Sequence, residues 1–148
     1  MRRAAIAILA LAAAAPAAAD EFGFAVALRF DPATAGALAE RGEAVVVSTV
    51  FYGEANAEGQ DQADDTGTIW LGNAEFTLAP GDQTVVIPGN IDRGALKWVE
   101  GGVVKANVNV FSARYSDERN ILDCGIFDDD VRVAQAAVPE IGCALLGN

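Results

Sequence analysis

Apolar and polar residues alternate along several stretches of the chain, and alternation with a period of two is typical of half-buried β-strands. The clearest stretch starts at Phe22, where a large apolar residue occupies every second position as far as Phe30. Residues 43–52 predict a second strand with two largely apolar faces, and residues 104–111 alternate as the first stretch does. Shorter apolar runs bounded by turn residues predict further strands at 68–71, 74–78, 84–87, 121–127, 131–134 and 141–146.

One short helix is predicted directly after the first strand. Asp31 can accept a hydrogen bond as an N-cap, Pro32 suits the first helical position, and Gly42 suits a helix end. These signals predict a helix over residues 32–41. Together with the short, closely spaced strands, they predict an all-β fold. We expect an antiparallel β-sandwich, immunoglobulin-like or related, of about seven to nine short strands with that single helix.

The first 19 residues have the pattern of a secretory signal peptide. Arg2 and Arg3 precede a continuous apolar run over residues 4–15, and the alanines at 17–19 fit a cleavage site. Removal of this segment leaves residues 20–148, which are enough for one domain with its own core. We expect this domain to reside in the periplasm or outside the cell.

The chain is strongly acidic, with 10 basic and 21 acidic residues and a formal net charge of −11. Loss of the signal peptide removes two of the arginines. Nucleic acids and anionic membrane surfaces are polyanions that bind basic proteins, so this charge argues against both as partners. No apolar run after the signal peptide approaches the roughly 20 residues that span a bilayer, so we expect no membrane insertion.

The two cysteines, Cys124 and Cys143, are predicted to form a disulfide. An isolated pair in an oxidising compartment usually does so, and their spacing does not match the C-x-x-C pattern of thioredoxin-type redox sites. Both cysteines lie in apolar alternating segments. The bridge therefore closes the β domain and has a structural role.

The sequence carries no signature of an enzyme. It contains no histidine, which excludes Ser-His-Asp and Cys-His catalysis and histidine-ligated zinc. Neither a phosphate-binding loop, a dinucleotide-binding glycine pattern nor a G-x-S-x-G elbow is present. We therefore expect a non-enzymatic protein without a cofactor. Bound calcium is the one alternative.

The segment from Gly53 to Gly67 is the best candidate for a functional loop. It has no strand pattern and no basic residue, and loops of this length are often functional. Asp61, Asp64 and Asp65 are candidate calcium ligands, because calcium prefers oxygen ligands. The spacing does not fit an EF-hand loop. The alternative, which we favour, is a solvated acidic loop.

Two further acidic clusters are candidates for chemistry. Asp128, Asp129 and Asp130 are predicted to form a hairpin turn after the strand at 121–127, because aspartate tolerates turn geometry. Asp117-Glu118-Arg119 forms either a charged recognition tip or an ordinary loop, and we favour the ordinary loop. A strand over 121–127 would hold these two clusters about 20 Å apart, too far for one pair of catalytic carboxylates.

The two tryptophans, Trp70 and Trp98, have two interpretations. Exposed aromatic residues on a sandwich can stack on sugars or anchor a partner, whereas so few tryptophans more often pack in the core. We favour core packing.

Three functions follow from these observations. The first is an exported, acidic, non-enzymatic β-sandwich that binds a protein or a component of the cell envelope. The second is a calcium-dependent binding module that uses the loop between Gly53 and Gly67. The third is a carboxylate-dependent glycan hydrolase.

Overall fold

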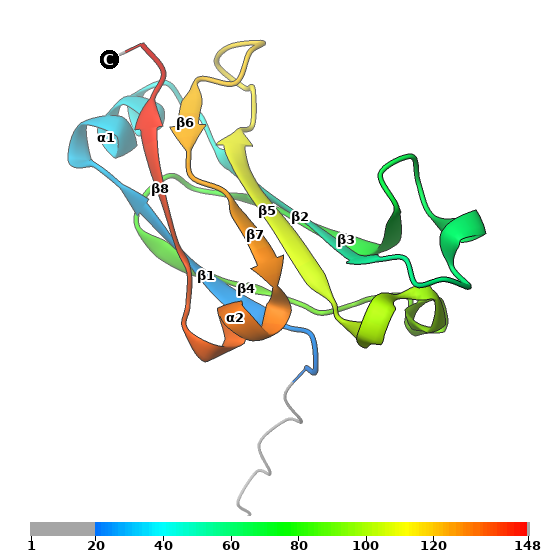
Figure 1. Ribbon diagram of the computed structural model, residues 1–148. Helices are drawn as coiled ribbons and strands as arrows, with labels where there is room; N and C mark the ends of the chain where they lie inside the picture. The colour runs from blue at the N-terminus through cyan, green and yellow to red at the C-terminus, as the bar shows by residue number, and fades with distance from the viewer. Residues whose placement is uncertain (1–19, 148) are drawn as a thin grey trace, which may run out of the picture.

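The computed structural model describes residues 20–147, which form two four-stranded β-sheets packed face to face (Figure 1). The first sheet contains, in spatial order, β4 (Gln83–Ile87), β1 (Phe24–Phe30), β8 (Glu140–Leu145) and β6 (Leu122–Cys124). The second sheet contains, in spatial order, β3 (Thr68–Leu78), β2 (Val45–Glu54), β5 (Lys105–Ser112) and β7 (Phe127–Asp130). The predicted β-sandwich is thus confirmed, while the predicted signal peptide at 1–19 lies outside the described residues.

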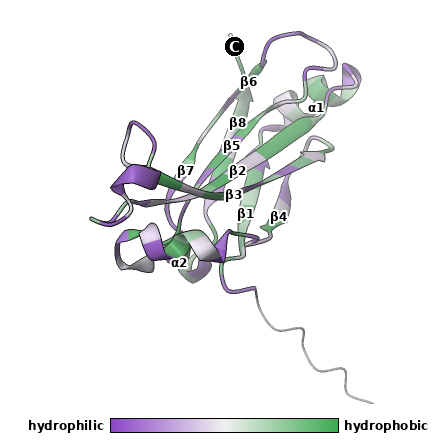
Figure 2. Ribbon diagram, turned by 90° about the vertical axis from the view of Figure 1, so that its right-hand side faces the viewer, coloured by the Kyte–Doolittle hydropathy of each residue, from purple (hydrophilic) through white to green (hydrophobic). Residues whose placement is uncertain are grey.

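The core lies between the sheets, because each strand directs one face inward. Phe24 of β1 packs on residues of the opposite sheet, with its ring centroid 6.1 Å from that of Phe51 and 5.9 Å from that of Phe127. Figure 2 shows hydrophobic residues concentrated along the strands and hydrophilic ones in the loops. Burial of these apolar faces is the main favourable contribution to folding.

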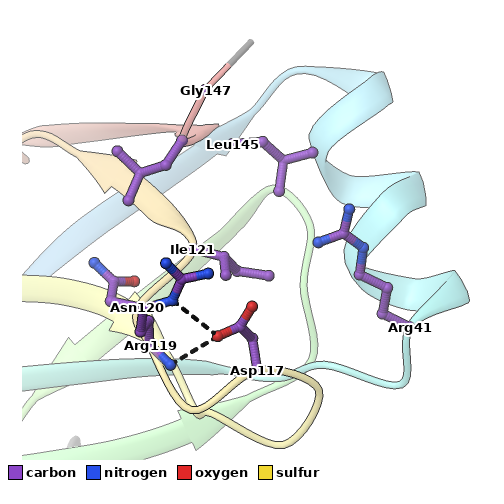
Figure 3. Close-up of a pocket in the computed structure, with 8 residues that line it drawn as sticks. Arg41, Asp117, Arg119, Asn120, Ile121, Leu145 and Gly147 are labelled. Carbon is purple, nitrogen blue, oxygen red and sulfur yellow. Dashed lines mark hydrogen bonds and ion pairs between the residues drawn. The ribbon is translucent and has the colours of Figure 1, made fainter.

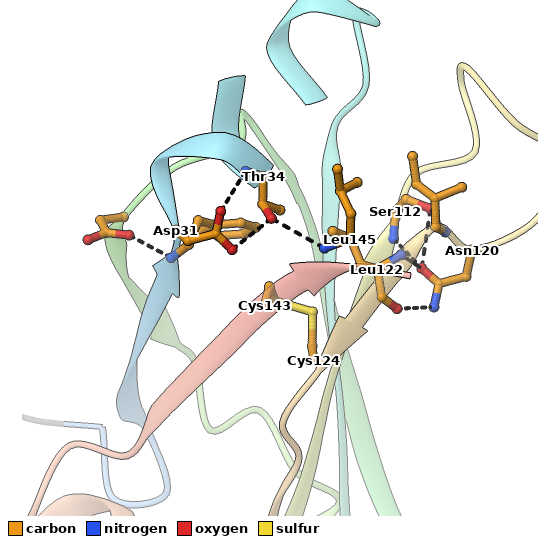
Figure 4. Close-up of a disulfide and its surroundings, with 11 residues drawn as sticks. Asp31, Thr34, Ser112, Asn120, Leu122, Cys124, Cys143 and Leu145 are labelled. Atoms are coloured by element: carbon orange, nitrogen blue, oxygen red, sulfur yellow. Dashed lines mark hydrogen bonds between the residues drawn. A yellow bond between two sulfur atoms is a disulfide. The ribbon is translucent and has the colours of Figure 1, made fainter. Parts of the chain in front are cut away.

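The predicted helix is present as α1 (Pro32–Glu40). The side chain of Asp31 accepts a hydrogen bond of 2.8 Å from the backbone N–H of Thr34, as an N-cap does. Gly42 follows the helix with a φ of 63°, a conformation that favours glycine. The buried Thr34 hydroxyl accepts a hydrogen bond from the Leu145 N–H and so fastens the helix to β8 (Figure 4).

Strand β3 differs from the two short strands predicted in this region. Residues 68–71 and 74–78 do not form two strands around a turn, but belong to one continuous strand. Gly72 is needed there for a close approach, since a Cβ at this position would lie 2.8 Å from the carbonyl oxygen of Asn90. A register shift between Phe51 and Tyr52 of β2 lies beside Gly72. The glycine therefore marks an irregularity within the sheet and no turn.

Three more predictions are wrong in the segment around 121–134. The predicted strand at 121–127 is divided between β6 and β7, which lie in different sheets. Asp128, Asp129 and Asp130 form no hairpin turn, because they continue β7 and pair with β5. Instead of a strand at 131–134, the helix α2 (Val131–Ala136) follows, with the Asp130 side chain as its N-cap. This cap and the burial of residues three apart, Val131 and Ala134, favour a helical turn.

The predicted disulfide between Cys124 and Cys143 is confirmed, with an S–S distance of 2.07 Å (Figure 4). The two cysteines face each other on the neighbouring strands β6 and β8. Cys143 is buried in the core and Cys124 packs partly against it. The bridge thus ties the three-residue edge strand β6 to its sheet.

Three short 3-10 helices complete the structure: η1 (Gln60–Gln62), η2 (Arg93–Trp98) and η3 (Glu100–Gly102). Within residues 20–147, none of the helices has the length and apolar character needed to cross a membrane.

Candidate functional site

The loop between Gly53 and Gly67 is fastened to η2 by backbone hydrogen bonds. The Asn56 backbone N–H donates to the carbonyl oxygen of Trp98 over 2.8 Å, and its side-chain amide donates to that of Lys97 over 2.8 Å. Gly59 lies so close that a Cβ there would be 2.4 Å from the Trp98 carbonyl oxygen. The loop and η2 therefore form one supported unit at the end of the second sheet.

The proposed calcium ligands of this loop are all exposed. Asp64 Oδ1 accepts hydrogen bonds from the Thr66 N–H, the Thr66 hydroxyl and the Thr68 N–H. The Thr66 hydroxyl and then the Thr68 N–H lower the pKa of Asp64. This carboxylate thus shapes the turn itself. Across residues 20–147, no group of three or more acidic or cysteine side chains is placed to hold a metal ion. Calcium binding by Asp61, Asp64 and Asp65 stays a prediction.

A groove of about 540 Å³ lies between β3 and η2 and is lined by both tryptophans. Trp70 points outward from β3 and is 59% exposed, whereas Trp98 is partly buried against the core. The prediction of core packing is therefore wrong for Trp70. The groove is bordered by polar side chains as well: Gln62 of the acidic loop, Asp92 and Lys97.

The groove is held in shape from both sides. The Asp92 backbone N–H donates to the Leu71 carbonyl oxygen over 2.7 Å, which fastens the start of η2 to β3. The Asp92 side chain caps η2 by accepting a hydrogen bond from the Gly94 N–H. Lys97 Nζ lies 4.6 Å from the centroid of the Trp98 ring, a cation–π contact. Side chains held in this way present a preformed surface.

A polar network crosses the outer face of the second sheet next to Trp70. The Tyr52 hydroxyl donates a hydrogen bond to Asp128, and Lys105 forms an ion pair of 2.6 Å with Glu54. Burial, followed by the Asp128 hydrogen bond, raises the pKa of Tyr52 to about 12. The hydroxyl therefore stays protonated and ties the short strand β7 to β2 across β5.

The carboxyl groups do not show the pattern expected of a glycosidase acid. A general acid at neutral pH needs a raised pKa. Every carboxyl group with a resolved shift has a lowered pKa: Asp31, Glu43, Glu54, Asp64 and Asp117. The hydrolase alternative stays an untested prediction that these groups do not favour.

A second cleft, also of about 540 Å³, lies between the end of α1 and the loop 113–121 (Figure 3). Arg41 reaches it from the helix end, and Asp117 and Arg119 reach it from the loop. Asp117 and Arg119 belong to the candidate tip at residues 117–119, whereas Arg41 was not among the predicted site residues. Nothing in the local pattern around Arg41 indicates that the fold brings it to a loop more than 70 positions later.

The loop beside this cleft is anchored from within. The buried Glu43 carboxylate accepts hydrogen bonds from the N–H of Tyr115 over 3.1 Å and from the N–H and hydroxyl of Ser116 over 2.9 and 2.6 Å. The Asn120 side chain bridges Ser112 and Leu122 at the other end of the loop. Hydrogen bonds to Glu43 and Asn120 thus fix the two ends of the loop that carries Asp117-Glu118-Arg119, whose role as a recognition tip or as an ordinary loop stays a prediction.

The comparison of this chain with protein-family models, curated proteins and solved structures yields no match. The geometry of these two surfaces is therefore the basis for assigning a function.

Proposed function

We propose that this protein is an exported, non-enzymatic binding module that recognises a basic segment of an envelope or extracellular protein. The binding surface is the groove lined by Trp70 and Trp98, here called the tryptophan groove, together with the acidic loop beside it. The observation that carries this proposal is the 59% exposure of Trp70 in a groove whose other wall is fixed.

Exposed tryptophan is a typical anchor at protein interfaces, because its large ring contributes much contact area at a low entropic cost. A tryptophan that only stabilised the core would be buried. Trp70 instead stands on a face of β3 that no other element covers fully. Partner binding would remove this apolar surface from water.

Charge supports a basic partner. The acidic loop, whose Gln62 lines the groove, carries the exposed carboxylates of Glu58, Asp61 and Asp65, and the groove itself is lined by Asp92 and Lys97. A lysine or arginine of the partner can pair with these carboxylates and stack on an indole ring. Lys97 already lies over the Trp98 ring, so the exposed ring of Trp70 is the aromatic face offered to a cation of the partner.

The test uses a fluorescein-labelled, lysine- and arginine-rich dodecapeptide and a glutamate-rich counterpart, with affinity followed by fluorescence anisotropy. We expect the basic peptide alone to bind, with an affinity that falls as salt rises, because exposed charges are screened. Trp70→Ala should weaken binding at least tenfold, and Asp92→Asn several-fold while keeping its capping oxygen.

Matched controls lie elsewhere on the molecule. Tyr115 is 69% exposed and Glu75 is exposed on β3, away from the groove. Tyr115→Ala and Glu75→Gln should therefore leave the affinity unchanged. Absence of binding, equal binding of both peptides, or equal loss in Tyr115→Ala and Trp70→Ala would overturn the proposal.

A further inference from the structure

We propose that the cleft between α1 and the loop 113–121, here called the arginine cleft, binds a carboxylate attached to an aliphatic chain. Arg41 and Arg119 would hold the carboxylate, and the apolar side chains Ile121, Leu145 and Leu146 would contact the chain. This site is separate from the tryptophan groove and does not depend on the function proposed for it.

The first support is the distribution of positive charge. Four basic residues elsewhere on the domain form ion pairs with carboxylates: Arg29 with Glu140, Arg93 with Glu21, Lys105 with Glu54, and Arg132 with Asp130. Arg41, like Lys97 and Arg114, forms no ion pair with any residue in the range 20–147. Arg41 lines the same cleft as Arg119 and Asp117, so among the described residues this cleft has two guanidinium groups and one carboxylate, and its second guanidinium can pair with an external anion.

The second support is the arrangement of Arg119. Its Nε lies 3.5 Å from Asp117 Oδ1, a long contact, and its side chain is 86% exposed. The same Asp117 oxygen accepts a shorter hydrogen bond, 2.9 Å, from the Arg119 backbone N–H. Asp117 therefore mainly shapes the loop, and most donors of the Arg119 guanidinium stay free for a ligand.

The two guanidinium groups lie at the same cleft. Figure 3 shows Asp117 and Ile121 between Arg41 and Arg119, with Arg119 joined to Asp117 and with Leu145 above them. The Arg119 N–H and side chain, with a smaller contribution from Arg41, lower the pKa of Asp117. Both arginines thus contribute positive potential at the position of this carboxylate. Planar guanidinium groups match carboxylates in geometry and can bind them through two parallel hydrogen bonds.

The apolar residues that line the cleft favour a ligand with an aliphatic chain. Leu146 is 55% exposed at the mouth of the cleft, and Leu145 and Ile121 are partly buried in its wall. A bare inorganic anion would leave this apolar surface in contact with water. The volume of about 540 Å³ lies within the range of small-molecule sites, which suits a medium-length aliphatic chain.

Preorganisation supports a binding role for this cleft. Glu43 and Asn120 fix the two sides of the loop that carries Asp117 and Arg119. Arg114 in the same loop adopts a φ of 65°, the left-handed region that is uncommon for residues other than glycine. A loop whose backbone is held by a buried carboxylate needs little further ordering of that backbone on binding, so the ligand has to order only the exposed side chains such as that of Arg119.

The test titrates octanoate into ¹⁵N-labelled protein comprising residues 20–148, with octylamine, acetate and sulfate as separate probes. We expect octanoate to shift the backbone amide signals of residues 117–121 and 145–147. Acetate and sulfate should bind at least tenfold more weakly because they lack the chain. Octylamine should not bind at this site because it carries the opposite charge.

Two variants decide the role of the arginines. Arg41→Gln and Arg119→Gln should each weaken octanoate binding about tenfold. Arg29→Gln is the matched control, since it removes the same charge from an exposed arginine paired with Glu140 on the first sheet. Because all three side chains are exposed, none of the changes should unfold the protein.

Four results would overturn the proposal: no shifts at millimolar octanoate, shifts outside the cleft only, equal binding of octylamine, or equal loss in Arg29→Gln. Two further probes identify the source of the carboxylate: a peptide that ends in leucine with a free C-terminal carboxylate, and the same peptide with a C-terminal amide. Preference for the peptide acid over octanoate would assign the cleft to a chain terminus, and the reverse preference to a free aliphatic acid.

Discussion

The buried carboxylate of Glu43 accepts two hydrogen bonds from Ser116, one from its backbone N–H over 2.9 Å and one from its hydroxyl over 2.6 Å. These residues are 73 positions apart. Glu43 lies just before β2, whereas Ser116 lies in the loop between β5 and β6. A single anionic side chain thus shapes the loop beside the arginine cleft and connects it to the second sheet.

Replacement of this carboxylate should destabilise the domain. In Glu43→Gln the amide keeps one acceptor oxygen but presents an NH₂ group towards the donors of Tyr115 and Ser116. We expect the free energy of unfolding to fall by about 1–3 kcal/mol, the cost of leaving buried polar groups unsatisfied. Urea denaturation checks this value. Glu40→Gln, on the exposed surface of α1, should change stability by less than about 0.5 kcal/mol. Equal effects of the two changes would contradict the structural role of Glu43.

Protonation of Glu43 at low pH should remove the same contribution to the free energy of unfolding in the unmodified protein. Burial alone would raise the pKa of Glu43, but hydrogen bonds from Ser116, Tyr115 and Ala44 outweigh it and lower the pKa to about 2. Because the folded value lies below the ordinary value of 4.5, the stabilisation is complete above pH 4.5 and is lost as the pH falls towards 2.

The measurement compares unfolding of the unmodified protein and Glu43→Gln across this range. The stability difference between them should be constant above about pH 5 and should narrow as the pH falls towards 2. A difference that stays constant down to pH 2 would show that the charge of Glu43 does not stabilise the fold.

Thr49 offers a stabilising substitution. Its side-chain oxygen is buried in β2 between the two sheets and has no hydrogen-bond partner among the residues described. Valine has nearly the same shape without the polar group, so Thr49→Val should raise the free energy of unfolding by about 1 kcal/mol. Thermal unfolding measures this. As a comparison, Thr77→Val on the exposed face of β3 should have little effect, and a loss of stability in Thr49→Val would contradict the assignment.

Gly59 tests whether the acidic loop supports the tryptophan groove. A Cβ at this position would lie 2.4 Å from the Trp98 carbonyl oxygen, so Gly59→Ala must displace the loop or η2. We expect a loss of about 1–3 kcal/mol, as for other overpacked sites. The fluorescence of Trp98 should change as well. To observe Trp98 alone, the measurement uses protein that also carries Trp70→Phe. Gly36→Ala in α1, where a Cβ meets nothing within 4 Å, should instead be neutral or slightly stabilising.

The disulfide should stabilise the domain without taking part in binding. The bridge joins residues 19 positions apart, and loops of this size give about 3 kcal/mol on the chain-entropy estimate. The double variant Cys124→Ser and Cys143→Ser should lose about this amount in urea denaturation. Octanoate and basic-peptide affinities should be unchanged at temperatures where the variant is folded, and a specific loss of either would reveal a further role for β6.

Local patterns in the sequence were sufficient for the elements whose signals are local. The alternation that starts at Phe22 predicted β1, and Asp31 with Pro32 and Gly42 predicted α1. The cysteine pair predicted the disulfide, because an isolated pair without the C-x-x-C spacing left few alternatives. The same patterns were sufficient for the β-sandwich class, since short alternating strands must bury one face against another sheet.

Pairing between distant strands decided what local patterns could not. Asp128, Asp129 and Asp130 have the composition of a turn, yet pairing with β5 and the Tyr52 hydroxyl hold them in β7. Gly72 resembles a turn residue, but a close approach by Asn90 accounts for it. In each case contacts made far along the chain outweighed local preference.

Both candidate sites belong to this second category. Nothing in the spacing of Trp70 and Trp98 shows that they share a groove, because β3 and η2 meet only after the sheet forms. Arg41 and Arg119 likewise come together only when α1 and the loop after β5 dock at one end of the sandwich. Sequence by itself determined the fold class, the bridge and the acidic character. The tertiary structure alone decided which exposed side chains converge, because convergence depends on long-range packing rather than on local pattern.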